Sequence, residues 1–225
     1  MSRFPLSVLA LSALLTLLAP ACSHVVGASV VGSGKKTSAT RTVPSFTEVR
    51  ATGAFRLEVQ SGAPATSVVV EGDDNPVPLF ETNVSSGALE LHLPSGSFSP
   101  KQPLVVHVAA PSVTKVGAIG AVTTEVAAIS GSEFEARLSG ACRLRLRGAV
   151  DAVHCVGDGA CEIEAFDLEA GEVELSLSGS SLADVQATRR LEVSSSGAST
   201  VRYRGKPEVK TSISGSSKVT PDEGR

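Results

Sequence analysis

Aromatic side chains are scarce in this sequence. Its 225 residues include no tryptophan, a single tyrosine at Tyr203 and seven phenylalanines. A helical globular core, or a cleft that stacks sugar rings on aromatic side chains, normally needs more of them. A stack of strands built from Val, Ala, Ser and Gly does not.

The sequence also lacks an excess of charge of either sign. Twenty Lys and Arg stand against 23 Asp and Glu, and both signs are spread along the chain. Binding to a phosphate backbone requires a basic stripe or patch. We therefore expect no nucleic-acid partner.

Helical periodicity is missing after the first 22 residues. Short runs of alternating apolar and polar residues, bounded by Gly, Pro, Asn and Ser, predict strands instead. Such runs cover residues 55–59, 67–71, 88–93 and 104–108, and the sequence D-D-N-P at 73–76 is typical of a turn. The expected fold class is therefore all-β.

The first 22 residues have the order of a signal peptide. An uncharged apolar run from Leu6 to Ala19 follows Arg3 and ends in L-A-P-A-C at Cys22. This ending resembles the lipobox of bacterial lipoproteins, although Ala19 stands where leucine is usual. The resemblance implies lipidation of Cys22 and, because Ser23 follows, placement in the outer membrane. A spanning helix and simple secretion are the alternatives.

Residues 23–44 are small and polar with little periodicity, and we expect a flexible spacer between the anchor and the domain. The domain is expected over residues 45–220, with a tail at 221–225.

An internal repeat dominates the second half of the chain. Glycines recur at steps of 20, 19, 20, 18 and 18 residues, at Gly120, Gly140, Gly159, Gly179, Gly197 and Gly215. A period near 20 with strand chemistry predicts a β-helix in which each turn is one rung. The glycines mark corners where φ is positive or where successive backbones come close.

The columns around these glycines test the register. Residues two and four places after each glycine are small or apolar, as an interior requires: Val122, Cys142, Cys161, Ser181, Ser199, Ser217 and Thr124, Leu144, Ile163, Ala183, Val201, Val219. The column five places after it is polar and faces outward by alternation: Glu125, Arg145, Glu164, Asp184, Arg202, Thr220. Opposite charges meet along it, as stacked strands favour.

Several segments together resemble a known family, the putative auto-transporter adhesins with a head GIN domain. The likeness runs through F-T-E-V-R-A-T-G-A-F-R-L-E-V at 46–59, V-V-V-E-G-D-D-N at 68–75, G-A-L-E-L-H-L at 87–93 and P-L-V-V-H-V-A-A-P-S-V-T-K-V-G-A-I-G-A at 103–121, and continues into the glycine rungs. It implies a single-stranded right-handed parallel β-helix. It brings no established catalytic residues.

Catalytic and metal-binding groups are not predicted. His24, His92 and His107 are expected at the surface, and alternation points His154 and Cys155 to opposite faces, which disfavours a Cys/His dyad. The cysteines lack the spacing of a zinc site. We therefore expect no catalytic residue, cofactor or metal.

Cys142 and Cys161 occupy equivalent places on adjacent rungs. Their Cα atoms should lie about 4.8 Å apart, within the range for a disulfide. An export route would expose them to an oxidising compartment. Two buried thiols are the equally fair alternative, and Cys155 is expected to be free.

The favoured function is that of a lipid-anchored, non-catalytic scaffold or adhesin-like binding module of the cell envelope. Its expected partners are the membrane, through the lipid, and an envelope polysaccharide or surface protein. The alternative is a polysaccharide-active enzyme, a β-helix of the lyase or hydrolase type. A cluster of acids beside a deep groove would favour the enzyme, and a shallow surface would favour the binding module.

The anchor can be tested directly. Cys22→Ala removes the thiol that would carry the lipid, so the variant should leave the membrane fraction and lose incorporation of labelled fatty acid. Unchanged membrane retention of the variant would contradict the lipoprotein interpretation.

Overall fold

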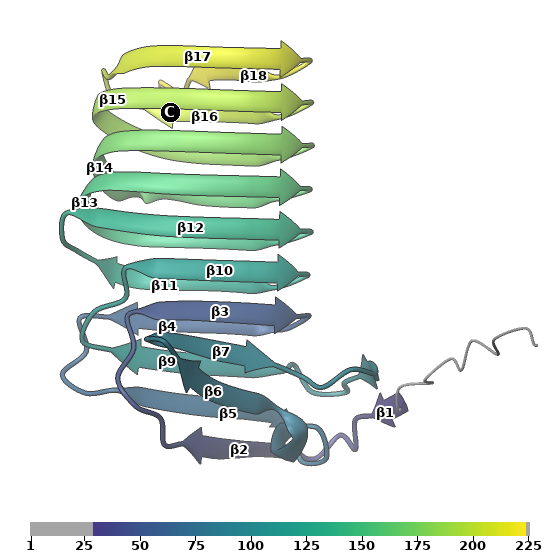
Figure 1. The fold of residues 1–225 in the computed structure, drawn as a ribbon. Helices are drawn as coiled ribbons and strands as arrows, with labels where there is room; N and C mark the ends of the chain where they lie inside the picture. Colours follow the sequence, from purple (N-terminus) through teal and green to yellow (C-terminus); the bar gives the residue numbers. More distant parts are fainter. Residues whose placement is uncertain (1–28, 224–225) are drawn as a thin grey trace, which may run out of the picture.

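The computed structural model describes residues 29–223, which form a parallel β-solenoid with two long faces (Figure 1). The predicted all-β class is confirmed. The signal peptide, Cys22 and His24 lie outside the described residues. The one helical element described is a short 3-10 turn, η1 (Val77–Leu79), and no described helix is long and apolar enough to cross a membrane.

Each rung contributes one strand to each face, and the chain turns between the faces at a glycine. The first face stacks β7 (Ala88–His92), β3 (Glu48–Gly53), β10 (Lys115–Gly120), β12 (Glu133–Gly140), the later halves of β13 (Arg143–Gly159), β14 (Glu162–Gly179) and β15 (Leu182–Gly197), and β17 (Glu208–Gly215). The second face stacks β9 (Val105–Ala110), β4 (Arg56–Ser61), β11 (Thr123–Ile129), the earlier halves of β13, β14 and β15, then β16 (Thr200–Arg204) and β18 (Lys218–Pro221).

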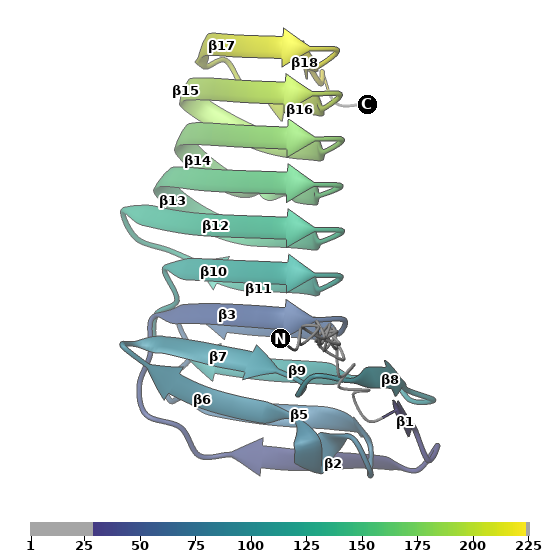
Figure 2. The same ribbon diagram turned by 45° about the vertical axis from the view of Figure 1, so that its right-hand side comes forward.

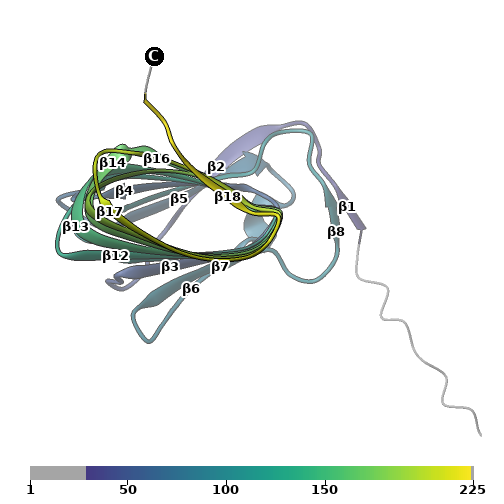
Figure 3. The same ribbon diagram turned by 90° about the horizontal axis from the view of Figure 1, so that it is seen from above.

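The winding is right-handed, as the resemblance implied. In Figure 1 the front strands run to the right, the rear strands return to the left, and the chain climbs toward its C-terminal end. Seen along the axis, the upper rungs superimpose closely (Figure 3). This in-register stacking brings equivalent residues of every rung into columns.

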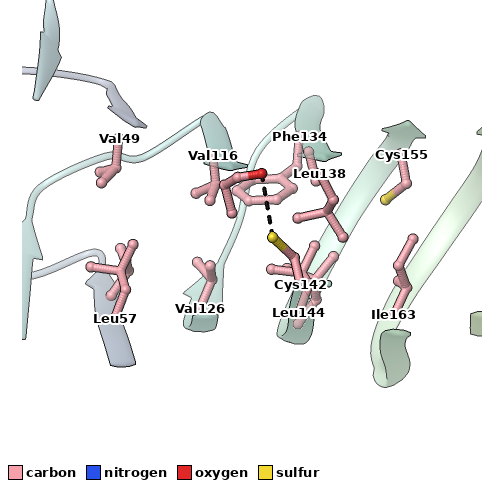
Figure 4. Close-up of a cluster of buried hydrophobic side chains, with 14 of the residues drawn as sticks. Val49, Leu57, Val116, Val126, Phe134, Leu138, Cys142, Leu144, Cys155 and Ile163 are labelled. Atoms are coloured by element: carbon pink, nitrogen blue, oxygen red, sulfur yellow. Dashed lines mark hydrogen bonds between the residues drawn. The ribbon is translucent and has the colours of Figure 1, made fainter. Parts of the chain in front are cut away.

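The inner columns have the predicted facing. Leu144, Ile163, Ala183 and Val201 on one face are buried, as are Phe134, Val153, Val173 and Leu191 on the other. Part of this core, with Leu57 and Val49 of the earlier rung, is shown in Figure 4. Burying a side chain of this size stabilises the fold by roughly 1.5–3 kcal/mol. The solenoid is therefore held together mainly by a narrow apolar stack between its faces.

The corner glycines have two reasons to be glycine. Gly120, Gly140 and Gly159 have φ of 103°, 103° and 106°, in the left-handed region. A Cβ on Gly140 would also lie 2.5 Å from the carbonyl oxygen of Gly120 below it. That oxygen accepts a hydrogen bond from the amide of Ala141 at 2.8 Å, so successive corners are bonded to each other.

The rung at Gly53 was not predicted from the sequence repeat. Gly53 lies directly beneath Gly120, and β3 and β4 form the rung below β10 and β11 although 67 positions separate the two glycines. The intervening chain travels down to build the N-terminal end and then returns. A signal existed, because A-T-G-A-F-R-L-E-V at 51–59 matches A-I-G-A-V-T-T-E-V at 118–126.

The N-terminal end is covered by antiparallel strands (Figure 2). On one face β6 (Glu81–Ser85) pairs with β7, and on the other β5 (Ser67–Asp73) pairs with β9 and β2 (Lys36–Arg41) pairs with β5. Outside these faces, β1 (Ser29–Val31) pairs with β8 (Ser97–Ser99). Strands of reversed direction end the parallel stack at this end.

Two expected boundaries are corrected by these strands. Residues 36–41, expected within the flexible spacer of 23–44, belong to the folded domain, because their backbone pairs with residues 68–73 and Ala39 packs against the core. The expected tail at 221–225 begins inside β18, and Asp222 accepts a hydrogen bond of 2.8 Å from Arg204.

The outer charge column is also observed. Arg145 donates to Glu164 at 2.8 Å and Arg202 donates to Asp184 at 2.7 Å, each between adjacent rungs. Glu125 differs from expectation, since its ion pair of 2.7 Å is with Arg147 rather than Arg145. Surface pairs such as Arg147–Glu125 contribute little stability each, typically below about 1 kcal/mol, whereas Asp184 is itself buried. These surface pairs indicate the register of the stacked rungs but contribute little to its stability.

The corners can be tested with a matched pair of variants. Gly179 (φ 87°) and Gly87 (φ 79°) share the left-handed conformation, but a Cβ on Gly179 would lie 2.4 Å from the oxygen of Gly159 whereas one on Gly87 meets nothing within 4 Å. Gly87→Ala should cost about 1 kcal/mol of unfolding free energy. Gly179→Ala adds a backbone clash and should cost about 2–4 kcal/mol. Equal losses in denaturant melts would show that the glycines do not stack as described.

Candidate functional site

The outer surface of the first face is hollowed at Gly117. The parallel register places this residue between Arg50 on the rung below and Arg137 on the rung above. Because glycine has no side chain, a hollow of about 400 Å³ opens there, with Ile119, Glu90 and His92 also at its walls. Ile119 is 56% exposed, which is high for a large apolar residue. We name this hollow the Gly117 notch.

Charges at the notch are balanced. The Arg50 guanidinium donates to Glu48 at 2.7 Å and lies 3.7 Å from Glu90. The hydrogen bond to Glu48 raises the pKa of Arg50 above its ordinary value. On the upper side Glu135 pairs with both Lys115, at 2.8 Å, and Arg137, and the Lys115 hydrogen bond lowers the pKa of Glu135. The notch thus offers donors and acceptors without a strong net field.

In the later rungs the outer surface of the same face carries many serine hydroxyl groups. Serines two apart on three successive rungs point outward in two columns and line a shallow groove of about 350 Å³: Ser176, Ser178, Ser194, Ser196, Ser212 and Ser214. Ser178 donates to Asp158 at 2.6 Å on the rung below. We name these residues the serine array.

The histidines lie on the surface beside acids. His154 Nδ1 is 2.9 Å from Glu174 and His107 Nδ1 is 3.0 Å from Glu58. His154 faces outward and Cys155 is buried, so the predicted opposition of these two side chains is confirmed. Among residues 29–223 no group of three or more His, Cys, Asp or Glu side chains is placed to hold a metal ion.

Cys142 and Cys161 lie in the corner column, buried, and both are free thiols in the structure. Their sulfurs approach backbone carbonyls, Cys142 Sγ that of Ser139 and Cys161 Sγ that of Asp158, each at 3.4 Å. Figure 4 shows the Cys142 side chain within the core. The column continues upward as serines, in which Ser217 Oγ accepts from the Ser199 amide at 3.1 Å. A Cys142–Cys161 disulfide stays a prediction.

Cys155 lies apart from that pair in the core of the first face. Burial raises its pKa to about 12, which keeps the thiol protonated and unreactive at neutral pH. Its position among Ala136 and Leu175 is that of a small apolar residue.

Asp73 is the residue whose role the sequence did not predict. Residues 74–76 do form a turn, but the Asp73 carboxylate is buried and accepts backbone hydrogen bonds from Gln102 at 3.0 Å, Gly34 at 2.6 Å and Lys101 at 2.8 Å. These bonds, led by that from Gln102, lower its pKa. Asp73 thus ties the segments around β1 and β8 to the domain.

Beside Asp73 lies a second hollow of about 430 Å³. Its walls are mainly apolar and include Leu93, Phe98 and Leu104. The sequence held no signal for this hollow or for the Asp73 contacts, because the partners lie about 30–40 positions away in loops without a motif.

Comparison with known proteins places this architecture in context. The sequence profile described as "Putative auto-transporter adhesin, head GIN domain" matches residues 45–207. No curated protein matches the sequence significantly.

Solved structures share the fold at low sequence identity. A putative adhesin from Bacteroides fragilis superimposes with a TM-score of 0.67 at 17% identity, over 85% of this chain and 98% of that one. A putative adhesin from Parabacteroides merdae gives 0.58 at 16% identity, over 87% and 99%. A protein from Parabacteroides distasonis described as a putative lipid binding protein gives 0.55 at 18% identity, over 87% and 100%.

Proposed function

This chain belongs to the family of putative auto-transporter adhesins with a head GIN domain, and from that premise we propose that it is a non-catalytic, lipid-anchored binding module of the bacterial cell envelope. The family supports a surface or envelope role. The L-A-P-A-C ending at Cys22 supports the lipid anchor and, with Ser23, an outer-membrane location.

The Gly117 notch carries the binding part of the proposal. Its exposed Ile119 offers an apolar surface, while Arg50 and Arg137 offer several N–H donors and Glu90 an acceptor. A sugar ring presents the matching groups, namely an apolar C–H face and a rim of hydroxyls that donate and accept. A few polar groups around an apolar floor are typical of a ligand site. We therefore propose a hydroxyl-rich envelope polysaccharide as the ligand.

The acids of the faces favour binding over catalysis. Many acids of the outer columns lie in ion pairs with Arg or Lys, such as Arg145–Glu164 and Lys115–Glu135, whereas Glu133 and Glu174 lie beside His154. A glycan-cleaving site needs carboxyl groups whose pKa values are pushed apart. No arrangement of side chains among residues 29–223 favours the enzyme alternative.

Filling the notch tests the proposal. Gly117 does not have positive φ, and a Cβ there would lie 3.8 Å from Arg50 Cγ, so Gly117→Leu should fold with a stability change below about 0.5 kcal/mol. It should weaken retention of the full-length chain on immobilised envelope polysaccharide by about tenfold or more.

Ser196→Leu is the matched control, since it adds a similar side chain to the same face but outside the notch. It should bind as the native chain does. Equal binding of the native chain and Gly117→Leu would exclude the notch as the binding site. Release of cleaved oligosaccharides by the native chain would favour the enzyme alternative.

A further inference from the structure

The two ends of the solenoid are not alike. The N-terminal end is covered by β2 and β6, whereas β17, on the last rung, pairs only with β15 among residues 29–223. All eight residues of β17 are exposed. β18 likewise pairs only with β16. An edge of this kind presents unpaired backbone N–H and C=O groups to any matching strand.

The core of the solenoid reaches this end uncovered. Val209, Thr211 and Ile213 continue the inner columns above Leu191, Val193 and Ser195. The residues beneath are buried, but Val209 is 37% exposed and Ile213 43% exposed. Repeat proteins normally end in a rung whose outer side is polar. The last rung among residues 29–223 still presents an apolar inner layer.

We propose that a second copy of this chain covers this end, with the two β17 strands paired antiparallel about a two-fold axis at Thr211. Residues directly opposite each other in an antiparallel pair lie on the same face of the sheet. A two-fold axis at Thr211 therefore places the inner side chains of both β17 strands on the core side. It sets Val209 opposite Ile213 of the partner subunit. It also sets Lys210 opposite Ser212 of the partner subunit, so no like charges meet.

A second copy fits better than a single peptide strand. The end consists of two strand edges, β17 on one face and β18 on the other, and one added strand would cover only one of them. Another copy of the same end presents two edges at the same separation. A two-fold contact of this type is self-complementary and closed. The contact is independent of the Gly117 notch, which lies on the outer surface several rungs away.

Cross-linking of the full-length chain tests the contact. Thr211→Cys would place two thiols opposite each other at the axis, so mild oxidation should give a disulfide-linked dimer on a non-reducing gel. Ser194→Cys is the control, because it keeps all the native cysteines but places the new thiol on the outer surface of the rung below. It should run as a monomer on the same gel.

Sedimentation gives an independent readout. The native chain in detergent should sediment as a dimer. Thr211→Lys, which sets two like charges at the axis, should shift it to a monomer that keeps the circular dichroism spectrum of the native chain, while its melting temperature falls by the stability that the dimer contact supplied. The proposal is overturned if the native chain is a monomer at tens of micromolar, if it forms an open series of larger species, or if Thr211→Cys links no better than Ser194→Cys.

Discussion

The hydrogen bond from the residue after each corner glycine to the carbonyl of the corner glycine one rung below is the constraint on which the rest of this structure depends. From Gly53 to Gly197 each corner carbonyl accepts an amide hydrogen bond at 2.7–2.9 Å from the residue after the next corner glycine. The glycines lie so close that a Cβ would come within 2.3–2.6 Å of the oxygen below it. Only glycine fits, so its place in the sequence fixes the register of each rung.

The surface follows from the same constraint. Once the corner is fixed, alternation decides which residues form the core and which form outward columns. Charged columns form where Arg and Glu stack, and the serine array forms where serines stack. The Gly117 notch forms where Gly117 interrupts a column between Arg50 and Arg137. The faces are therefore nearly flat, with shallow features set by single positions. It is on this kind of surface that we propose an extended polysaccharide binds.

The sequence predicted the repeating part well and the N-terminal part poorly, for a physical reason. From Gly120 onward each rung stacks on the one just before it in the chain, so period, facing and charge pairing are all local. The rung at Gly53 stacks across a long insertion, and β2 pairs with β5, about 30 positions away. Asp73 likewise acts through Gly34 and Lys101, distant in sequence. Contacts between residues so far apart along the chain produce no periodic pattern in the sequence.

The corner amides are hydrogen-bonded between rungs although some of their residues are exposed at the surface. Ser180 is exposed, yet its amide donates to the Gly159 carbonyl at 2.8 Å. Native-state hydrogen exchange resolved to single amides tests this most directly. The Ser180 amide should exchange as slowly as amides of the buried strands, through opening of whole rungs. Exchange as fast as that of exposed turn residues such as Ser132 would contradict it.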